Sequence, residues 1–465
     1  MSLNRICATV FAACMLLALA GPALAANYPN NAQFIAYYNP EALANAGITT
    51  PDNAGTTYVN PAAATTKKVA ANALTTTLTT PSSTDWPQFH YNAKHDGTSP
   101  STGLPSSNSS VWSANIQAIG TTNPIISNGK VFVLTGFAGF DEPSALTQIN
   151  LTCLDESTGS VLWNFPLPRM VHYGSWSSPA TDGTYVYASS DYQHYAIRVS
   201  DGVEMWNFTG YNVNVNGGPV IGGDNVYFSD WSDYYCLDKT TGSLNWVFDN
   251  TDTTTYDMNY AQASPAYDAT DGSIYVTGYT GSVGYLYKVD SSGNEVWSVQ
   301  GDSNQNFCGS AALDSSNVYV TSYNFNGNGK LYAYSKSNGT LVWSKSIERS
   351  DATPAIANGL VYVDGGCAGY ANPGVRAFYA NDGTLAWSRA NAGMGGWTDS
   401  VSVADGYAFV GHESSSNNYC YDTVYALDAL TGATEWSHPQ GGATAAIANG
   451  QMYTIGNDGY LYRFG

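Results

Sequence analysis

The sequence predicts an all-β fold: an eight-bladed β-propeller of four-stranded antiparallel blades, with an N-terminal strand closing the last blade. Three observations predict it. A tryptophan preceded by a glycine four residues earlier recurs seven times, at intervals of 40 to 51 residues between successive tryptophans. Two strand-like segments precede each glycine–tryptophan unit, and the last repeat ends one strand short. Periods of this length are typical of radially repeated sheets.

The glycine of each repeat lies in a tight turn between two outer strands. Thr-Gly, Asp-Gly and Asn-Gly dipeptides supply the positive φ that such a hairpin requires. The turn glycines are Gly159, Gly202, Gly242, Gly293, Gly339, Gly383 and Gly432. The outer-strand tryptophans are Trp112, Trp163, Trp206, Trp246, Trp297, Trp343, Trp387 and Trp436. We expect each indole to pack on the neighbouring blade near its glycine turn, which makes these residues structural.

Two further strands precede each hairpin. One alternates apolar and aromatic residues, as in Val318-Tyr319-Val320, and the other is rich in small residues, as in 352–356. After Trp436 only three strands remain, around 443–447, 451–456 and 459–464, whereas residues 111–116 form an unassigned outer strand. Pairing the N-terminal strand 111–116 with the last of these three strands would complete the eighth blade, close the ring and remove an open sheet edge. A seven-bladed ring with an additional hairpin is the alternative.

The pattern A-x-D-x-x-T-G-x-x-x-W, complete at Ala426–Trp436, resembles the tryptophan-docking motif of the pyrroloquinoline-quinone (PQQ)-like propeller family. The segment Asp85-Trp86-Pro87-Gln88-Phe89, followed by Asp96–Ser99, resembles the segment that leads into that family's ring. The resemblance covers roughly residues 85–465 and implies the eight-bladed fold. We expect a branch without dehydrogenase activity, because the family's dehydrogenases resemble longer chains with a vicinal Cys-Cys pair that is absent here. The blade-4 copy, ending at Trp297, is one residue short, so we expect its turn to differ.

Three regions are predicted along the chain. Residues 1–25 read as a signal peptide, with Arg5, an apolar run and an Ala-Leu-Ala cleavage site; an uncleaved anchor is the alternative. Residues 26–84 form a Thr/Ala/Pro-rich N-terminal segment or linker, and 85–465 form the propeller. We therefore expect a secreted protein, extracellular or periplasmic at the cell surface, with no transmembrane segment in the mature chain.

The formal net charge of −20 repels phosphate backbones and anionic headgroups. Nucleic-acid partners are therefore not expected. A protein or glycan ligand at the propeller face is expected instead, because long loops at 136–148, 364–374 and 411–422 are suited to recognition.

The starts of the inner strands predict where a ligand would bind. Aligning them gives a ring of residues at one mouth of the central channel: Thr121, Trp176, Asn216, Gln262, Cys308, Asp351, Thr398 and Gly442, flanked by Trp397 and Asp399. Small polar residues follow two positions later, for example Ser178, Ser264 and Ser400, and we expect them to line a wet channel. Trp176, Asn216, Gln262, Asp351, Trp397 and Asp399 are the ligand-binding candidates, whose amides, carboxylates and exposed indoles suit a sugar, a peptide loop or a hydrated cation. A water-filled channel without a specific ligand is the alternative.

No cofactor, metal or catalytic residue is expected. PQQ carries three carboxylates and would require several converging basic residues together with a calcium ion. The ring of aligned residues holds no basic residue, and the nearest ones, Arg169, Arg349 and Arg389, lie in adjacent loops. No Ser-His-Asp order, HExxH or CxxC motif occurs. PQQ with calcium remains the alternative.

Five cysteines follow the predicted signal peptide. Cys153 and Cys236 occupy the third strands of blades 1 and 3, too far apart for a mutual disulfide, and are expected to be buried thiols. Cys367 and Cys420 lie on equivalent loops of neighbouring blades, so a disulfide between them is predicted.

The preferred function is that of an exported, non-enzymatic binding or scaffold module at the cell surface. A PQQ-dependent dehydrogenase is the first alternative, supported only by the repeat. The second is an envelope scaffold similar to the propeller lipoprotein that assists outer-membrane protein assembly.

Overall fold

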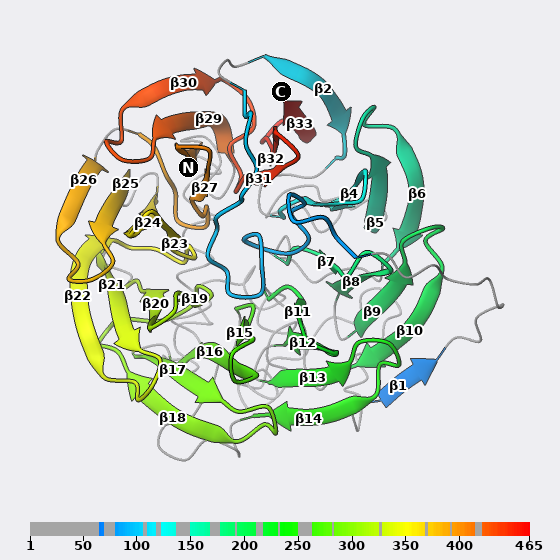
Figure 1. Cartoon of the computed structure of the whole chain (residues 1–465), viewed down its shortest axis with the longest axis horizontal. Helices are drawn as coiled ribbons and strands as arrows, with labels where there is room; N and C mark the ends of the chain where they lie inside the picture. The colour runs from blue at the N-terminus through cyan, green and yellow to red at the C-terminus, as the bar shows by residue number, and fades with distance from the viewer. Residues whose placement is uncertain are drawn as a thin grey trace, which may run out of the picture.

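The computed structural model describes residues 65–68, 80–105, 109–117, 122–135, 149–167, 177–190, 193–210, 217–230, 233–249, 263–280, 283–324, 328–367, 371–390, 393–413 and 421–465. This part of the chain consists of strands and turns and contains no helix. Eight antiparallel sheets are arranged radially around a common centre (Figure 1). The predicted eight-bladed propeller is therefore confirmed, and the seven-bladed alternative is excluded.

Each blade runs from an inner strand at the centre to an outer strand at the perimeter. Blade 1 contains β3 (Ile125–Ser127), β4 (Lys130–Thr135), β5 (Asn150–Asp155) and β6 (Val161–Pro166); blade 2 contains β7 (Ala180–Thr181), β8 (Tyr185–Ser190), β9 (Gln193–Arg198) and β10 (Glu204–Thr209). Blade 3 contains β11 (Val220–Gly222), β12 (Asn225–Ser229), β13 (Tyr234–Asp238) and β14 (Leu244–Phe248); blade 4 contains β15 (Ala266–Asp268), β16 (Ser273–Tyr279), β17 (Gly284–Val289) and β18 (Glu295–Gln300).

The second half of the ring repeats the arrangement. Blade 5 contains β19 (Ala312–Leu313), β20 (Asn317–Thr321), β21 (Asn328–Ser335) and β22 (Leu341–Glu348); blade 6 contains β23 (Ala355–Ala357), β24 (Leu360–Cys367), β25 (Ala371–Tyr379) and β26 (Leu385–Ala390). Blade 7 contains β27 (Ser402–Ala404), β28 (Tyr407–Glu413), β29 (Tyr421–Asp428) and β30 (Thr434–His438); blade 8 contains β31 (Ala446–Ala448), β32 (Gln451–Ile455), β33 (Tyr460–Phe464) and the N-terminal β2 (Ser110–Asn115).

Strands extend into two of the predicted recognition loops. β24 continues to Cys367 and β25 begins at Ala371, so most of 364–374 is a paired hairpin, with Asp364 opposite Val375. In 411–422, β28 continues to Glu413 and β29 begins at Tyr421. The backbone ladder of β24 and β25 therefore continues past the apolar residues of these strands.

The closure of the ring follows the predicted pairing. β2 pairs with β33, with Ser113 opposite Tyr462. The ladder between the third and outer strands shifts register at the residue before the tryptophan in every blade, including Trp112 of β2. β2 therefore has the geometry of an eighth outer strand, contributed by the other end of the chain.

Each tryptophan lies against the next blade. Its indole N–H donates to a backbone carbonyl of that blade at 2.9–3.2 Å, the acceptors being Glu156, Val199, Lys239, Ser291, Lys336, Ala380, Ala429 and, for Trp436, Pro105. The seven turn glycines have φ between +68° and +89°. A Cβ on any of them would lie within 3.0 Å of an atom of the preceding blade's indole, so a side chain has no room there.

The turn of blade 4 is shorter, as its sequence predicts. The amide of Gly293 donates to the carbonyl of Asp290, three residues earlier, whereas the amide of Gly432 donates to that of Asp428, four residues earlier. The docking contact with Trp246 is nevertheless kept.

The segment 84–101, called the lead-in segment below, crosses the centre of the ring (blue in Figure 1). It is hydrogen-bonded to all eight blades at the ends of their inner strands, over distances of 2.6–3.0 Å. The blade residues are Ile126 (to Trp86), Thr181 (to Pro87), Ile221 (to the Gln88 side chain), Tyr267 (to Ala93), Leu313 (to Lys94), Ile356 (to Asp96), Val403 (to Gly97) and Gly450 (to the Ser101 hydroxyl). One face of the ring, called the lead-in face, is therefore occupied by the chain itself.

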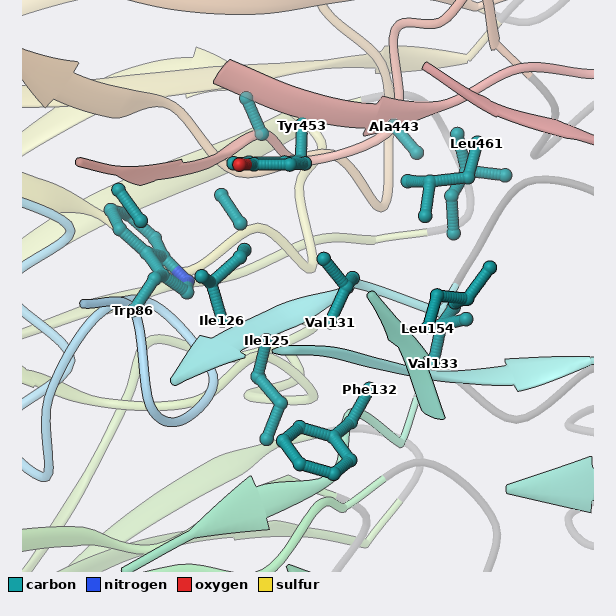
Figure 2. Close-up of a cluster of buried hydrophobic side chains, with 14 of the residues drawn as sticks. Trp86, Ile125, Ile126, Val131, Phe132, Val133, Leu154, Ala443, Tyr453 and Leu461 are labelled. Carbon is teal, nitrogen blue, oxygen red and sulfur yellow. The ribbon is translucent and has the colours of Figure 1, made fainter. Parts of the chain in front are cut away.

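The hydrophobic core lies between adjacent blades. Between blades 8 and 1 it includes Ile126, Val131, Tyr453 and Leu461, and Trp86 of the lead-in segment packs beside Ile126 (Figure 2). The lead-in segment is thus continuous with the core of the propeller.

Part of the N-terminal segment also contacts the ring. β1 (Thr65–Lys68) pairs antiparallel with β10 and adds a fifth strand to blade 2. The predicted signal peptide and most of 26–84 lie outside the described residues. In the part of the chain that the structure describes, no helix is both long enough and apolar enough to cross a membrane.

Candidate functional site

The predicted site lies on the face opposite the lead-in segment, where the inner strands begin; we call it the start face. Of the six predicted ligand-binding residues, Trp176, Asn216 and Gln262 lie outside the described residues. The structure places Asp351, Trp397 and Asp399 close to the starts of β23 and β27, in blades 6 and 7. The amide of Asp351 donates to the carbonyl of Trp397 at 3.0 Å, which joins the two predicted positions directly.

Trp397 is enclosed rather than exposed. Its residue is 1% exposed, which contradicts the expected open indole. The Arg349 guanidinium lies over the ring, with Cζ 3.9 Å from a ring centroid, and Tyr323 packs edge-on at 5.1 Å between centroids. Arg349 is itself buried, and a cation over a desolvated indole face is held by cation–π attraction.

Cys308 joins the same group from blade 5. Its thiol lies 3.6 Å from the Tyr323 hydroxyl. Burial raises the pKa of the Cys308 thiol well above its usual value, and the charge of Asp351 raises it further. The thiol is therefore protonated and is not an activated nucleophile. Cys308, Tyr323, Arg349, Asp351 and Trp397 together are called the Trp397 cluster below.

Asp351 is the acid of this cluster. Both of its carboxyl oxygens are shielded from solvent, and neither makes a hydrogen bond of normal geometry. Burial raises the pKa of the Asp351 carboxyl to about 7, although the Trp397 indole N–H and the Arg349 guanidinium act in the opposite direction. The group therefore exchanges a proton near neutral pH, a property more common at functional sites than elsewhere.

Asp399 belongs to a second group of buried residues, which includes Asp364, Gly411 and Thr444. Its carboxylate accepts hydrogen bonds from the Gly411 amide at 2.7 Å and the Thr444 hydroxyl at 3.0 Å. Burial raises the pKa of Asp399 to about 7, and burial together with the nearby Asp399 charge raises that of Asp364 well above its usual value. We call Asp364 and Asp399 the carboxyl pair. Both carboxyls are buried, and the hydrogen bonds of Asp399 join blade 7 to blade 8.

The small polar residues expected to line a wet channel have another role. Their hydroxyls accept hydrogen bonds from amides of the preceding inner strand: Ser178 from Asn123, Ser264 from Gly218, Ser400 from Thr353 and Thr444 from Ser400. All four hydroxyl-bearing residues are buried. The inner strands are close enough for side chains to satisfy backbone amides across blades, so these positions stabilise the ring.

Sequence reasoning missed three residues of this region, Tyr323, Asp364 and Tyr421, and did not count Arg349 among the ligand-binding candidates. Tyr421 is buried, and its hydroxyl is hydrogen-bonded to the Thr398 hydroxyl at 3.0 Å. Arg349 had been assigned to an adjacent loop. A signal was present in the sequence, since Arg349 stands two residues before Asp351 in a chain with only 16 basic residues.

The described residues do not fit PQQ with a divalent cation. Near Asp351 they supply one base, Arg349, and a pair of buried carboxyls, whereas a tricarboxylate would require several converging bases. Within the described ranges, no three His, Cys, Asp or Glu side chains are placed to share a metal ion.

The cysteines of the blades are placed as expected. Cys153 on β5 and Cys236 on β13 are buried free thiols, which confirms that part of the prediction. Cys420 lies outside the described residues, so its disulfide with Cys367 stays a prediction.

Comparisons with known proteins agree with this architecture. A family model described as outer membrane protein assembly factor BamB matches residues 104–290 and 282–451. The curated tetrathionate hydrolase of Acidithiobacillus ferrooxidans is 24% identical over 314 residues, 57% of this chain and 58% of that protein. The match thus spans less than two thirds of that relative's length.

Solved structures share the fold at low identity. BamB from Moraxella catarrhalis is 15% identical, with a TM-score of 0.56, covering 77% of this chain and 97% of that one. The quinohemoprotein alcohol dehydrogenase ADHIIG from Pseudomonas putida HK5 is 13% identical, with a TM-score of 0.64, covering 82% and 80%. Because the family model matches most of the ring, the chain belongs to the PQQ-like propeller family described as outer membrane protein assembly factor BamB.

Proposed function

We propose that this protein is an exported binding propeller of the cell envelope, and that a protein partner docks on its start face over blades 5 to 7. The observation that carries the proposal is the Trp397 cluster. It places a buried arginine, a tyrosine and a buried carboxyl together on the face opposite the lead-in segment.

The physical argument rests on the cost of such a cluster. Burying ionisable groups without full hydrogen bonding is unfavourable, so the Trp397 cluster lowers the stability of the free protein. A partner group that hydrogen-bonds to Asp351 would recover part of that cost. The family description names an assembly factor, which favours a protein over a small molecule as the partner that supplies the group bound to Asp351.

Site-specific photo-crosslinking in the full chain tests the proposal. A photoreactive residue is placed at Thr398 on the start face and, as the matched control, at exposed Lys94 on the lead-in face. We expect one protein partner to be captured from the start face only, and Asp351→Asn to reduce that capture severalfold. Equal capture from both faces, or capture unaffected by Asp351→Asn, would refute the proposal.

A hydrolase is the second candidate. The raised pKa of Asp351, to about 7, suits a general acid, and the curated relative is named for tetrathionate hydrolysis. Arg349 would then bind an anionic substrate. Incubation with tetrathionate between pH 3 and 7 tests this: thiosulfate release that disappears in Asp351→Asn would replace the binding proposal, and no release from the wild type would eliminate the hydrolase.

A further inference from the structure

Blade 2 differs from the other seven blades at its outer edge. β1 pairs with β10 over four residues, with Thr65 opposite Thr209, Thr66 opposite Phe208, Lys67 opposite Asn207 and Lys68 opposite Trp206. Among the described residues, the outer strands of the other blades have no strand beyond them. The fifth strand comes from a segment that precedes the whole repeat, so it is an addition to the blade rather than part of it.

The outer edges of this propeller are suited to strand addition. An outermost strand presents a row of unpaired backbone amides and carbonyls, and proteins commonly protect such edges with charged residues. Here the outer strands instead expose apolar side chains, including Val161 and Leu162 on β6 and Leu341 and Val342 on β22.

Trp206, opposite Lys68 in the register, is 1% exposed. Trp343, Trp387 and Trp436 are also buried, at 7–9% exposed, although no fifth strand lies on their blades among the described residues. The pairing of β1 with β10 is therefore additional to the tryptophan docking contact and is not required for it.

We propose that the outer edge of blade 2 is a strand-docking site for an extended segment of a partner protein, which β1 occupies within the free chain. The partner segment would carry β-branched residues followed by lysines, as β1 does. Main-chain hydrogen bonds supply the affinity in this mode of recognition, and side chains select the sequence.

Charge and length support this occupant. The chain carries 36 acidic residues and Glu204 is the first residue of β10, so a lysine-bearing strand is complementary to this edge. β1 is only four residues long, and short edge ladders open readily, so β1 can be displaced. The edge lies on the perimeter, apart from the start face, and this inference does not depend on the proposed function.

Peptide binding to the full chain tests the proposal. The probe is a fluorescein-labelled peptide of residues 63–70, AATTKKVA, measured by fluorescence anisotropy. Thr66→Pro removes a ladder donor from β1, and we expect it to bind the probe at least tenfold more tightly than the wild type. Thr66→Ala keeps the ladder and should behave as the wild type does. A probe with proline at the Thr66 position should not bind.

A cross-linked variant makes the test independent of how Thr66→Pro folds. Lys67→Cys combined with Asn207→Cys places two thiols directly opposite in the register, so oxidation locks β1 on β10. The oxidised protein should exclude the probe and the reduced protein should bind it, with the wild type under both conditions as the control. Equal binding in both states, or dimers of the reduced protein in mass photometry that indicate a second copy as occupant, would overturn the proposal.

Discussion

Replacing Gly432 with alanine places a methyl group against the indole of Trp387. The new Cβ would lie 2.6 Å from Trp387 Cε3, which real Cβ atoms do not approach, and Gly432 has a φ of +71°. The backbone conformation costs an L-residue about 1–2 kcal/mol. Crowding in a packed contact adds about 1–3 kcal/mol. We therefore expect Gly432→Ala to lower the free energy of unfolding by about 2–5 kcal/mol.

The same blade offers a matched control. Gly406 has a φ of +84°, but no atom lies within 4 Å of its ideal Cβ position, so Gly406→Ala carries the backbone cost alone. Urea unfolding followed by tryptophan fluorescence compares the two variants at equal m-values. The expected difference between them is about 1–3 kcal/mol. Equal losses in both variants would refute the view that the indole–glycine contact limits this position.

Three further predictions concern the acids, the closure and the thiols. Asp351 in the folded protein takes up its proton at about pH 7, but an unperturbed aspartate does so at 3.8. The folded state therefore binds more protons between these values, stability falls as pH rises from 4 to 7, and Asp351→Asn should flatten that slope in urea midpoints measured at pH 5 and 7. Trp436→Phe removes the hydrogen bond to Pro105 at the point where the chain ends meet, and should cost about 1–3 kcal/mol and expose residues 101–105 to limited proteolysis. Burial raises the pKa of Cys153 to about 12 and that of Cys236 to about 11, so neither should react with Ellman's reagent at pH 8 until the protein unfolds; rapid labelling of the native protein would contradict their burial.

The architecture was predictable because its determinants are local and repeated. A glycine with positive φ and a tryptophan four residues later specify an outer hairpin wherever they occur, as at Gly432 and Trp436. The missing outer strand could be recognised at Trp112 because it carries the same residue at the same place. Strand lengths were less predictable: β24 and β25 extend past the apolar core through Asp364 and Gly374, which carry no strand signal.

The candidate site was predictable only where it follows the repeat. Asp351 and Trp397 were found because they stand at aligned starts of inner strands. Arg349, Tyr323 and Asp364 lie outside the aligned starts of the inner strands, and their approach to the site depends on the packing of adjacent blades, which no spacing in the chain encodes. The hydrogen-bond partners of the Asp399 carboxylate could not be predicted for the same reason, since Gly411 and Thr444 lie on two different blades.

The central position of the lead-in segment has a consequence for cooperativity. In most repeat arrays each unit interacts only with its neighbours, so local unfolding stays local. Here every blade is hydrogen-bonded to the same central segment, the lead-in segment. Melting of any blade must therefore loosen an element common to all the others, and a ring built from eight similar parts unfolds as a unit.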